Sequence, residues 1–222
     1  GFEISRKFTY GTKQGGDYFD IFAHEDKMKF SILLASCSGY AMSAAFLSVI
    51  LQHSSVLEGR KTLSVEDTVR ILAEELGQIA APQDETQLFY AVVDRRHMTM
   101  SFSCIGKISG IIQSTDESAN ESIRIISSDS KGISVGRRIE YSSLEVDLKP
   151  GYRICRVSEG LVNTLDIDEL VSVAEETVTG SVHELRNQMF IQAQIKSGLE
   201  LPLKDQTVIV IEVKDNVMKL AK

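Results

Sequence analysis

Hydrophobic and polar residues alternate along many short segments of the chain, and this pattern predicts a protein rich in β-strands. From Met98 to Cys104 every second residue is apolar and each residue between is Thr or Ser, which is typical of a half-buried strand. The turn Asp94–His97 joins this strand to the apolar run Leu88–Asp94 as a hairpin. The other predicted strands are Met28–Ala35, Ile108–Gln113, Ser122–Ile126, Tyr141–Leu148, Tyr152–Val157 and Thr207–Val213.

Four further segments carry apolar residues at helical spacing. In the clearest of them, Val65, Val69, Leu72 and Leu76 fall on one face, so this helix is expected to bury that face. Ser followed three residues later by an acidic residue predicts a capping box at two helix starts, Ser64 with Asp67 and Ser181 with Glu184. The predicted helices are Met42–Leu57, Ser64–Ala80, Ile167–Thr177 and Val182–Lys196.

Strands therefore gather in the middle of the chain, and helices gather at two places. We find no internal repeat, no low-complexity linker and no shift in composition, so one domain over residues 1–222 is the simplest organisation. The expected fold is of the α+β class: two antiparallel sheets flanked by helix pairs, a four-layer α-β-β-α sandwich.

Composition and charge exclude several kinds of protein. The 222 residues include 31 Asp and Glu against 24 Lys and Arg, a formal charge of −7, which argues against a nucleic-acid partner. Cys37, Cys104 and Cys155 form no Cys–His cluster, so we expect buried, reduced thiols in a cytoplasmic protein and no zinc site. The four histidines share no motif and are expected at the surface.

Apolar runs are all too short to cross a membrane, so no membrane contact is expected for this domain. Because the chain opens at Gly1 rather than Met, we expect a domain excised from a longer protein. That parent protein would carry an upstream sensor or regulatory region, and a membrane anchor there is compatible with this sequence.

The strongest chemical signal lies in Gly15–Asp20, which reads Gly-Gly-Asp-Tyr-Phe-Asp, and in Ala35–Ala45, which is rich in small residues. These segments predict a turn that carries Asp17 and Asp20, then a strand, a tight turn and a helix. A carboxylate at a strand end beside a second loop is a common arrangement for binding a cation.

The order of these segments resembles that of the metal-dependent PPM-type serine/threonine phosphatases, in the SpoIIE-like and RsbU-like bacterial branch. That family has a G-G-D-aromatic-aromatic-D motif, a strand, and a D-V-S-G-x-G turn before a helix that begins with two alanines. The resemblance covers nearly the whole chain and includes the first strand, which begins Phe2-Glu3-Ile4-Ser5. Later segments resemble the family motifs A-G-H, L-x-P-G-D, T-D-G-L and D-D-x-T, namely Cys104–Lys107, Leu148–Tyr152, Ser158–Leu161 and Lys204–Thr207.

The resemblance implies a site in which four carboxylates hold two Mg²⁺ or Mn²⁺ ions, which generate a hydroxide that attacks a phosphoserine or phosphothreonine. This chain keeps the first position as Asp17, but the other three are Ser36, Glu159 and Lys204. The four positions carry a formal charge of −1 instead of −4. Two divalent ions about 4 Å apart repel by on the order of 16 kcal/mol at an effective dielectric near 20, which this charge cannot offset.

The sequence therefore predicts a degenerate metal site with no cofactor expected, in which Lys204 replaces the metal by pairing with Asp17 or Glu159. Asp205 is a possible additional carboxylate, because a one-residue slip would bring it to the position of Lys204. If any metal binds, the expected ligands are Asp17, Asp20 and Glu159. Ordinary roles are the alternative at each place: a turn cap, a turn carboxylate and a solvated lysine.

The leading functional interpretation is a regulatory or protein-binding module of bacterial partner switching with little or no phosphatase activity. The partner implied by the resemblance is a phosphorylated antagonist of the STAS class or the upstream sensor domain, and a homodimer is a further possibility. The alternative is an active Mn²⁺- or Mg²⁺-dependent phosphoserine/phosphothreonine phosphatase with an atypical site. A purely structural dimerisation module is the third class.

Overall fold

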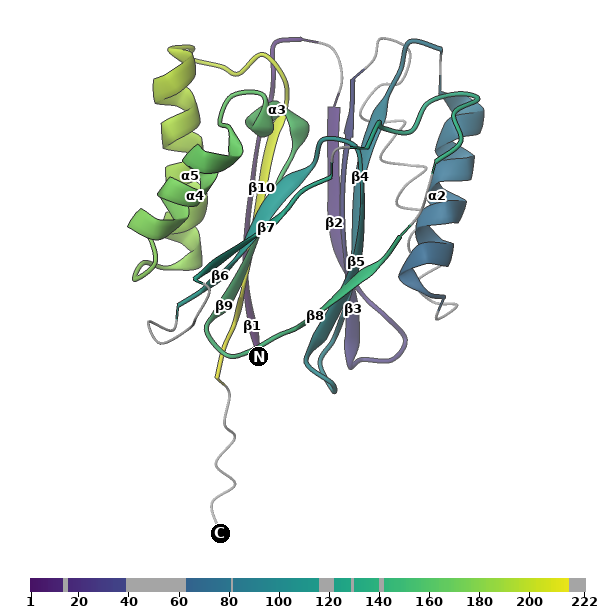
Figure 1. Cartoon of the computed structure of the whole chain (residues 1–222). Coiled ribbons are helices and arrows are strands. Elements are labelled where there is room, and N and C mark those ends of the chain that lie inside the picture. The colour runs from purple at the N-terminus through teal and green to yellow at the C-terminus, as the bar shows by residue number, and fades with distance from the viewer. Residues whose placement is uncertain are drawn as a thin grey trace.

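Two five-stranded antiparallel sheets face each other across an apolar interior (Figure 1). The computed structural model describes residues 1–13, 16–38, 63–80, 82–115, 122–128, 130–139 and 142–215. The first sheet has the order β1-β10-β9-β6-β7 and the second β2-β3-β4-β5-β8. Their strands are β1 Phe2–Thr9, β2 Gly16–Ala23, β3 Lys29–Cys37, β4 Thr86–Asp94, β5 Thr99–Ile105, β6 Ser109–Ser114, β7 Ile123–Ile126, β8 Leu144–Asp147, β9 Tyr152–Val157 and β10 Gln206–Val213.

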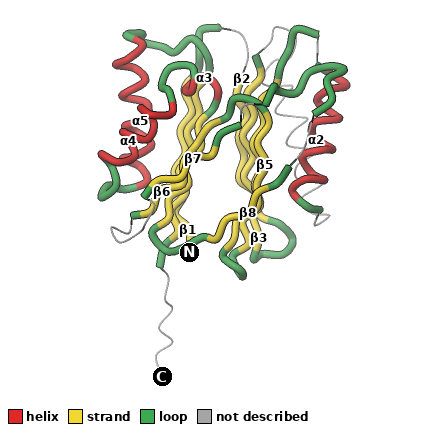
Figure 2. Tube along the Cα trace, in the orientation of Figure 1, coloured by secondary structure: helices red, strands yellow, loops and turns green. Residues whose placement is uncertain are grey.

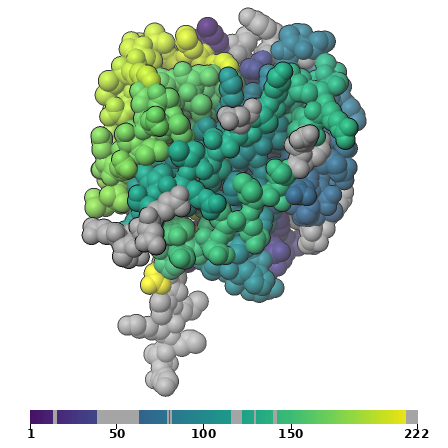
Figure 3. All heavy atoms as spheres, viewed as in Figure 1, coloured from purple at the N-terminus to yellow at the C-terminus, as the bar shows by residue number. Residues whose placement is uncertain are grey.

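Helices cover the outer faces of both sheets (Figure 2). α4 (Ile167–Glu176) and α5 (Val182–Ser197) lie on the first sheet, and α2 (Val65–Ile79) lies on the second. The short α3 (Glu159–Val162) directly follows β9 at one end of the sandwich. In the space-filling view, the green and yellow flank of α4 and α5 lies opposite the blue flank of α2 (Figure 3). The α-β-β-α order of layers confirms the predicted fold class.

Period-two alternation explains why a strand such as β4 is apolar almost throughout. Phe89, Ala91 and Val93 point into the core between the sheets, whereas Leu88 and Tyr90 pack against the α2 side. A strand that is buried on both faces needs apolar residues at every position. This is the physical reason for the uninterrupted run that the sequence shows from Leu88 onward.

The predicted strands and three of the four predicted helices are confirmed, with ends shifted by a few residues. The hairpins of β4 with β5 and of β6 with β7 form as expected. The predicted helix Met42–Leu57 lies outside the described residues. Among the described residues, no helix is long and apolar enough to cross a membrane.

Several local predictions are wrong, each for a reason that the structure supplies. Asp17 and Asp20 lie within β2 rather than in a turn, because residues 16–23 pair with β3 along their whole length. Ser64 and Ser181 cap their helices, but only the forward bond of each box is present. The complete capping box belongs to Asp166 and Glu169, at the start of α4.

Two side chains are placed differently from the sequence-based expectation. His24 is buried rather than exposed, because its Nε2 lies 2.6 Å from Ser31 Oγ, which in turn lies 2.8 Å from Tyr90 Oη. Burial lowers the pKa of the His24 imidazole. Cys104 is half-buried, whereas Cys37 and Cys155 are buried as predicted, and all three thiols are free.

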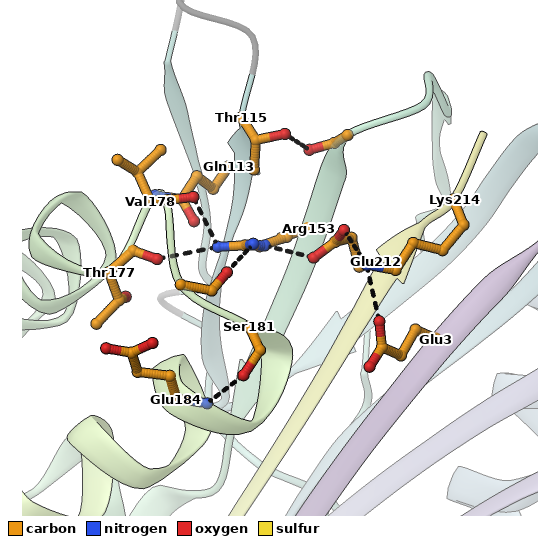
Figure 4. Close-up of polar contacts among 12 residues, drawn as sticks. Glu3, Gln113, Thr115, Arg153, Thr177, Val178, Ser181, Glu184, Glu212 and Lys214 are labelled. Carbon is orange, nitrogen blue, oxygen red and sulfur yellow. Dashed lines mark hydrogen bonds and ion pairs between the residues drawn. The ribbon is translucent and has the colours of Figure 1, made fainter.

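A buried arginine ties the first sheet to its helices (Figure 4). Arg153 of β9 donates from Nε to Glu212 of β10 at 2.7 Å. Its other nitrogens donate to the backbone oxygens of Thr177, Val178 and Gly180, in the connection between α4 and α5. The guanidinium therefore has a carboxylate partner and donates to three carbonyl groups of the connection between α4 and α5.

Candidate functional site

The candidate site lies at the end of the sandwich where β2 and β3 of one sheet meet β10 and α3 of the other. Asp17 is the second residue of β2 and is paired with Ser36 of β3 in the strand register. Thr207, near the start of β10, reaches across from the opposite sheet to Asp17. The fold therefore brings together residues that are up to 190 positions apart in the sequence.

Hydroxyl groups surround the carboxylate of Asp17. Ser36 Oγ donates to Oδ1 at 2.5 Å and Thr207 Oγ1 donates to Oδ2 at 2.8 Å. The Ser158 side chain also hydrogen-bonds this carboxylate. Each lone pair of the carboxylate that accepts a hydrogen bond from a hydroxyl group is no longer available to bind a metal ion.

Burial raises the pKa of Asp17 from 3.8 to about 6, although the residue as a whole is partly exposed. The three hydroxyl donors act in the opposite direction, and the neighbouring Asp205 raises the pKa further. Desolvation of the charged form outweighs the hydrogen bonds here. Asp17 is therefore a carboxyl group whose environment does not fully stabilise its negative charge.

Glu159 and Lys204 form an ion pair, with Lys204 Nζ 2.9 Å from Glu159 Oε1. The Glu159 side chain is 11% exposed and the Lys204 side chain 34%. α3 comes close to the turn before β10 because residue 160 is Gly: a Cβ atom there would overlap the backbone oxygen of Asp205. The predicted pairing of Lys204 with one of the two acidic residues is thus observed.

Asp205 also points into this region, but it serves the backbone. Its Oδ1 accepts from the Gly11 amide at 2.7 Å and its Oδ2 from the Asp17 amide at 3.2 Å. Both Lys204 and Asp205 therefore reach the site from one turn, Lys204 toward Glu159 and Asp205 toward the start of β2.

Asp20 does not join this group. It lies three residues after Asp17 on the same strand, so alternation places the two side chains on opposite faces of the sheet. Its carboxylate accepts from Tyr18 Oη at 3.3 Å, and Tyr18 packs against the core beneath α2. The set Asp17, Asp20 and Glu159 is therefore not assembled in one place.

Two residues of the site, Ser158 and Thr207, were not singled out as candidates in the sequence. In the sequence they were noted only as parts of segments that resemble family motifs. Their hydroxyl groups bond to Asp17 only because the two sheets pack against each other. Cys37 follows Ser36 on β3, and its side chain packs on the α2 face of the sheet. Burial raises the pKa of its thiol, a hydrogen bond with Thr86 lowers it, and nearby charges have smaller effects. No local sequence pattern marks such contacts.

A pocket of about 400 Å³ opens next to Lys204. We call it the basic pocket because three lysines line it, Lys13, Lys196 and Lys204. Its remaining lining is Gly160, Asn163, Thr164, Ser197, Leu199, Pro202 and Leu203. Lys196 also pairs with Glu169 at 2.5 Å. The pocket thus combines cations and polar groups with an apolar wall.

Comparison with known proteins relates this arrangement to solved structures alone, since no protein-family model and no curated protein matches the chain. A bacterial serine phosphatase matches with a TM-score of 0.75 at 12% identity, over 96% of this chain and 98% of that one. The RsbU and RsbW domains of a Mycobacterium tuberculosis protein match with a TM-score of 0.76 at 13% identity, over 96% of this chain and 61% of that one.

The PP2C phosphatase domain of SpoIIE from Bacillus subtilis, solved with a fragment of its regulatory domain, matches with a TM-score of 0.72 at 13% identity. The match covers 96% of this chain and 64% of that one, so this chain spans about two-thirds of the length of such multidomain structures. At sequence identities this low, the similarity shows that the fold is shared and nothing beyond the fold. With its two five-stranded sheets and flanking helices, the chain has the fold of the bacterial PPM-type (PP2C-type) serine/threonine phosphatases, as in SpoIIE and RsbU.

Proposed function

We propose that this domain is a degenerate PPM-type phosphatase domain, which acts in bacterial signalling as a regulatory, protein-binding module and has little or no phosphatase activity. The observation that carries the proposal is the Lys204–Glu159 ion pair, with Nζ 2.9 Å from Oε1. An ammonium group lies where the resemblance expects a carboxylate, and it neutralises the second carboxylate of the set.

The chemistry of the donor set does not fit two divalent ions. The four positions Asp17, Ser36, Glu159 and Lys204 have a formal charge of −1. Hard cations such as Mg²⁺ and Mn²⁺ require several oxygen ligands, usually charged. Among the described residues, no group of three or more His, Cys, Asp or Glu side chains is placed to hold a metal ion. The residues present therefore do not fit such a metal centre, whereas RsbX, a protein of similar fold, was solved in complex with magnesium.

Metal titration tests this part of the proposal. We expect calorimetry to detect no Mn²⁺ binding at micromolar affinity, and Mn²⁺ to support no hydrolysis of p-nitrophenyl phosphate. The double variant Ser36→Asp with Lys204→Asp restores two carboxylates and is expected to gain Mn²⁺ affinity. A control with the same change of charge, Ser36→Asp with Lys196→Asp, is expected to gain less.

Two results would contradict the degenerate-site proposal. One is the binding of two Mn²⁺ ions by the unmodified domain with micromolar affinity. The other is hydrolysis that depends on Mn²⁺ and is lost in Asp17→Asn, which would support the alternative function of an active phosphatase.

The surface beside the ion pair supports a protein partner. Five aliphatic residues of α5 and of the segment that follows it are 41–68% exposed, and we call them the aliphatic rim: Ile191, Ile195, Leu199, Leu201 and Leu203. Leu199 and Leu203 line the basic pocket, and α5 also supplies Lys196 to it. Clusters of exposed apolar residues of this kind commonly mark interaction sites. Lysines beside an apolar rim suit a partner that presents a phosphoserine within an apolar surface, as a phosphorylated STAS-type antagonist would.

A pair of peptides tests the partner class. A phosphoserine peptide is expected to bind several-fold more tightly than its unphosphorylated twin in fluorescence anisotropy, and Lys13→Ala with Lys204→Ala is expected to remove the difference. Lys149→Ala, in the exposed turn before β9, is the matched control. Equal binding of both peptides would exclude phosphoserine recognition. If the domain is a dimer in solution and the Ile195→Glu variant is a monomer, the aliphatic rim is instead a surface of self-association.

A further inference from the structure

Strand β9 carries two buried arginines with different surroundings. Arg153 is 5% exposed and pairs with the carboxylate of Glu212, whereas Arg156 is 1% exposed and forms no ion pair with any described carboxylate. Arg156 Nη1 donates to the Ile126 backbone oxygen at 2.9 Å, and its Nε has no hydrogen-bond acceptor among the described residues. A permanently charged group is thus buried between the sheets among neutral groups.

Among the described residues, the sulfur of Cys104 is the group in hydrogen-bond contact with this cation that is able to carry a negative charge. Arg156 Nη2 lies 3.2 Å from Cys104 Sγ and 3.4 Å from the Ile108 backbone oxygen. The other face of the guanidinium lies over the Phe89 ring, 4.0 Å from its centroid. A buried charge without a counter-charge is strongly unfavourable, and the neutral acceptors around the guanidinium do not remove this cost. A negative charge that develops on the Cys104 sulfur during a reaction would therefore be stabilised by Arg156.

The position of the guanidinium is fixed by the fold. A Cβ atom on Gly110, the register partner of Arg156 on β6, would lie 2.7 Å from Arg156 Cδ. Glycine at this position therefore leaves the space through which the side chain reaches Cys104 on the opposite sheet. Burial lowers the pKa of Arg156, and the neighbouring Cys104 acts in the opposite direction.

Cys104 is also the most accessible of the three thiols. It lines a pocket of about 260 Å³ together with Phe102, Ser103, Arg124, Glu145 and Val146, among other residues. Cys37 and Cys155 are buried, and burial raises the pKa of the Cys155 thiol to about 12. A small reagent can thus approach one thiol that has a cation beside it, which is the environment of reactive cysteines.

We propose that Cys104 is a modification site: a thiol that the adjacent Arg156 guanidinium activates for reaction with hydroperoxides and other small electrophiles. In the reaction with hydrogen peroxide, the thiolate sulfur attacks one oxygen and the O–O bond breaks. The leaving hydroxide takes up a proton and becomes water. Sulfur is oxidised to sulfenic acid as the peroxide is reduced. This inference uses no residue of the candidate site and does not depend on the proposed function.

Alkylation of the folded chain tests the proposal. With iodoacetamide at pH 7, peptide mapping is expected to show Cys104 modified at least tenfold faster than Cys37 or Cys155 and faster than N-acetylcysteine. Thiolate absorbance near 240 nm at pH 7 is expected in the native protein and absent in Cys104→Ser. Hydrogen peroxide with dimedone is expected to label Cys104 alone.

Variants separate the role of the cation from simple exposure. Arg156→Met is expected to slow the alkylation of Cys104 at least tenfold, whereas Arg124→Met, which changes a residue of the same pocket, leaves it within twofold. If Arg156→Met does not fold, the proposal is still tested by the difference in absorbance near 240 nm between the native protein and Cys104→Ser. Alkylation of Cys104 no faster than that of N-acetylcysteine, or no thiolate absorbance at pH 7, would overturn the proposal.

Discussion

Asp17 is a carboxyl group held by hydroxyl donors in a site where its charge is poorly solvated. Ser36, Thr207 and Ser158 donate to it, yet burial leaves its pKa at about 6. In the folded state the proton is therefore bound up to a higher pH than in the unfolded chain, where the pKa is near 3.8. Ionised Asp17 destabilises the fold above pH 6, and this effect disappears below pH 3.8.

Replacement of Asp17 by Asn is accordingly expected to stabilise the protein. The full change of pKa corresponds to about 3 kcal/mol, and we expect on the order of 2 kcal/mol at pH 7.5 because the residue is partly exposed. Urea unfolding of both proteins from pH 4 to 8 measures this difference in the free energy of unfolding. The gain must shrink as the pH falls from 6 to 4; a gain that does not vary with pH would disprove this electrostatic origin.

At the scale of elements, the connection between α4 and α5 depends on a single buried side chain. Arg153 of β9 satisfies the backbone oxygens of Thr177 and Val178 while it pairs with Glu212 of β10 (Figure 4). Without the guanidinium, the Val178 oxygen would lose its donor and the Thr177 oxygen would keep only the Gly180 amide. Among the described residues, Glu212 would keep Lys214 as its charged partner.

Arg153→Met is therefore expected to destabilise the protein by about 3 kcal/mol, because breaking a buried pair leaves the other groups unsatisfied. Thermal unfolding followed by circular dichroism measures the loss. Arg186→Met, a partly exposed arginine of α5, is the matched control and is expected to change stability by less than about 0.5 kcal/mol. Equal losses in the two variants would show that Arg153 has no special role.

At the scale of the whole molecule, the candidate site is also a contact between the two sheets. Thr207 of β10 is fully buried and donates to Asp17 of β2 at 2.8 Å. Asp205, just before β10, accepts from the Asp17 amide. Polar contacts thus link the sheets at this end, whereas apolar packing and the contact of Arg156 with Cys104 join them elsewhere.

Thr207→Val removes the hydroxyl with little change of shape and is expected to cost about 1–3 kcal/mol, since the partly buried carboxylate of Asp17 loses a donor. A double-mutant cycle with Asp17→Asn is expected to give a coupling of at least about 0.5 kcal/mol in the free energy of unfolding. Thr68→Val, whose hydroxyl bonds within the first turn of α2, is the control and is expected to show no coupling. Strict additivity of Thr207→Val with Asp17→Asn would contradict a direct contact.

Much of the architecture was predictable because it follows from local periodicity. Apolar residues with a period of two identified strands such as β5, and apolar residues at helical spacing identified α2. Both signals are independent of the rest of the chain. The predicted turn at Asp17 and Asp20 failed because pairing with β3 extends β2 through both residues. The predicted exposure of His24 was wrong because its burial depends on contacts with Ser31 and, through it, Tyr90. These residues are not neighbours of His24 in the sequence.

The sequence by itself determined the order of strands and helices, the α+β class and the absence of carboxylates at two of the four expected positions. These are properties of residue identity and of the period of apolar residues. Only the tertiary structure decided that Lys204 pairs with Glu159, that Asp17 and Asp20 face opposite sides of the sheet, and that Arg156 meets Cys104. Such contacts arise where two sheets meet, so their distances depend on the packing of the whole fold and no local pattern encodes them.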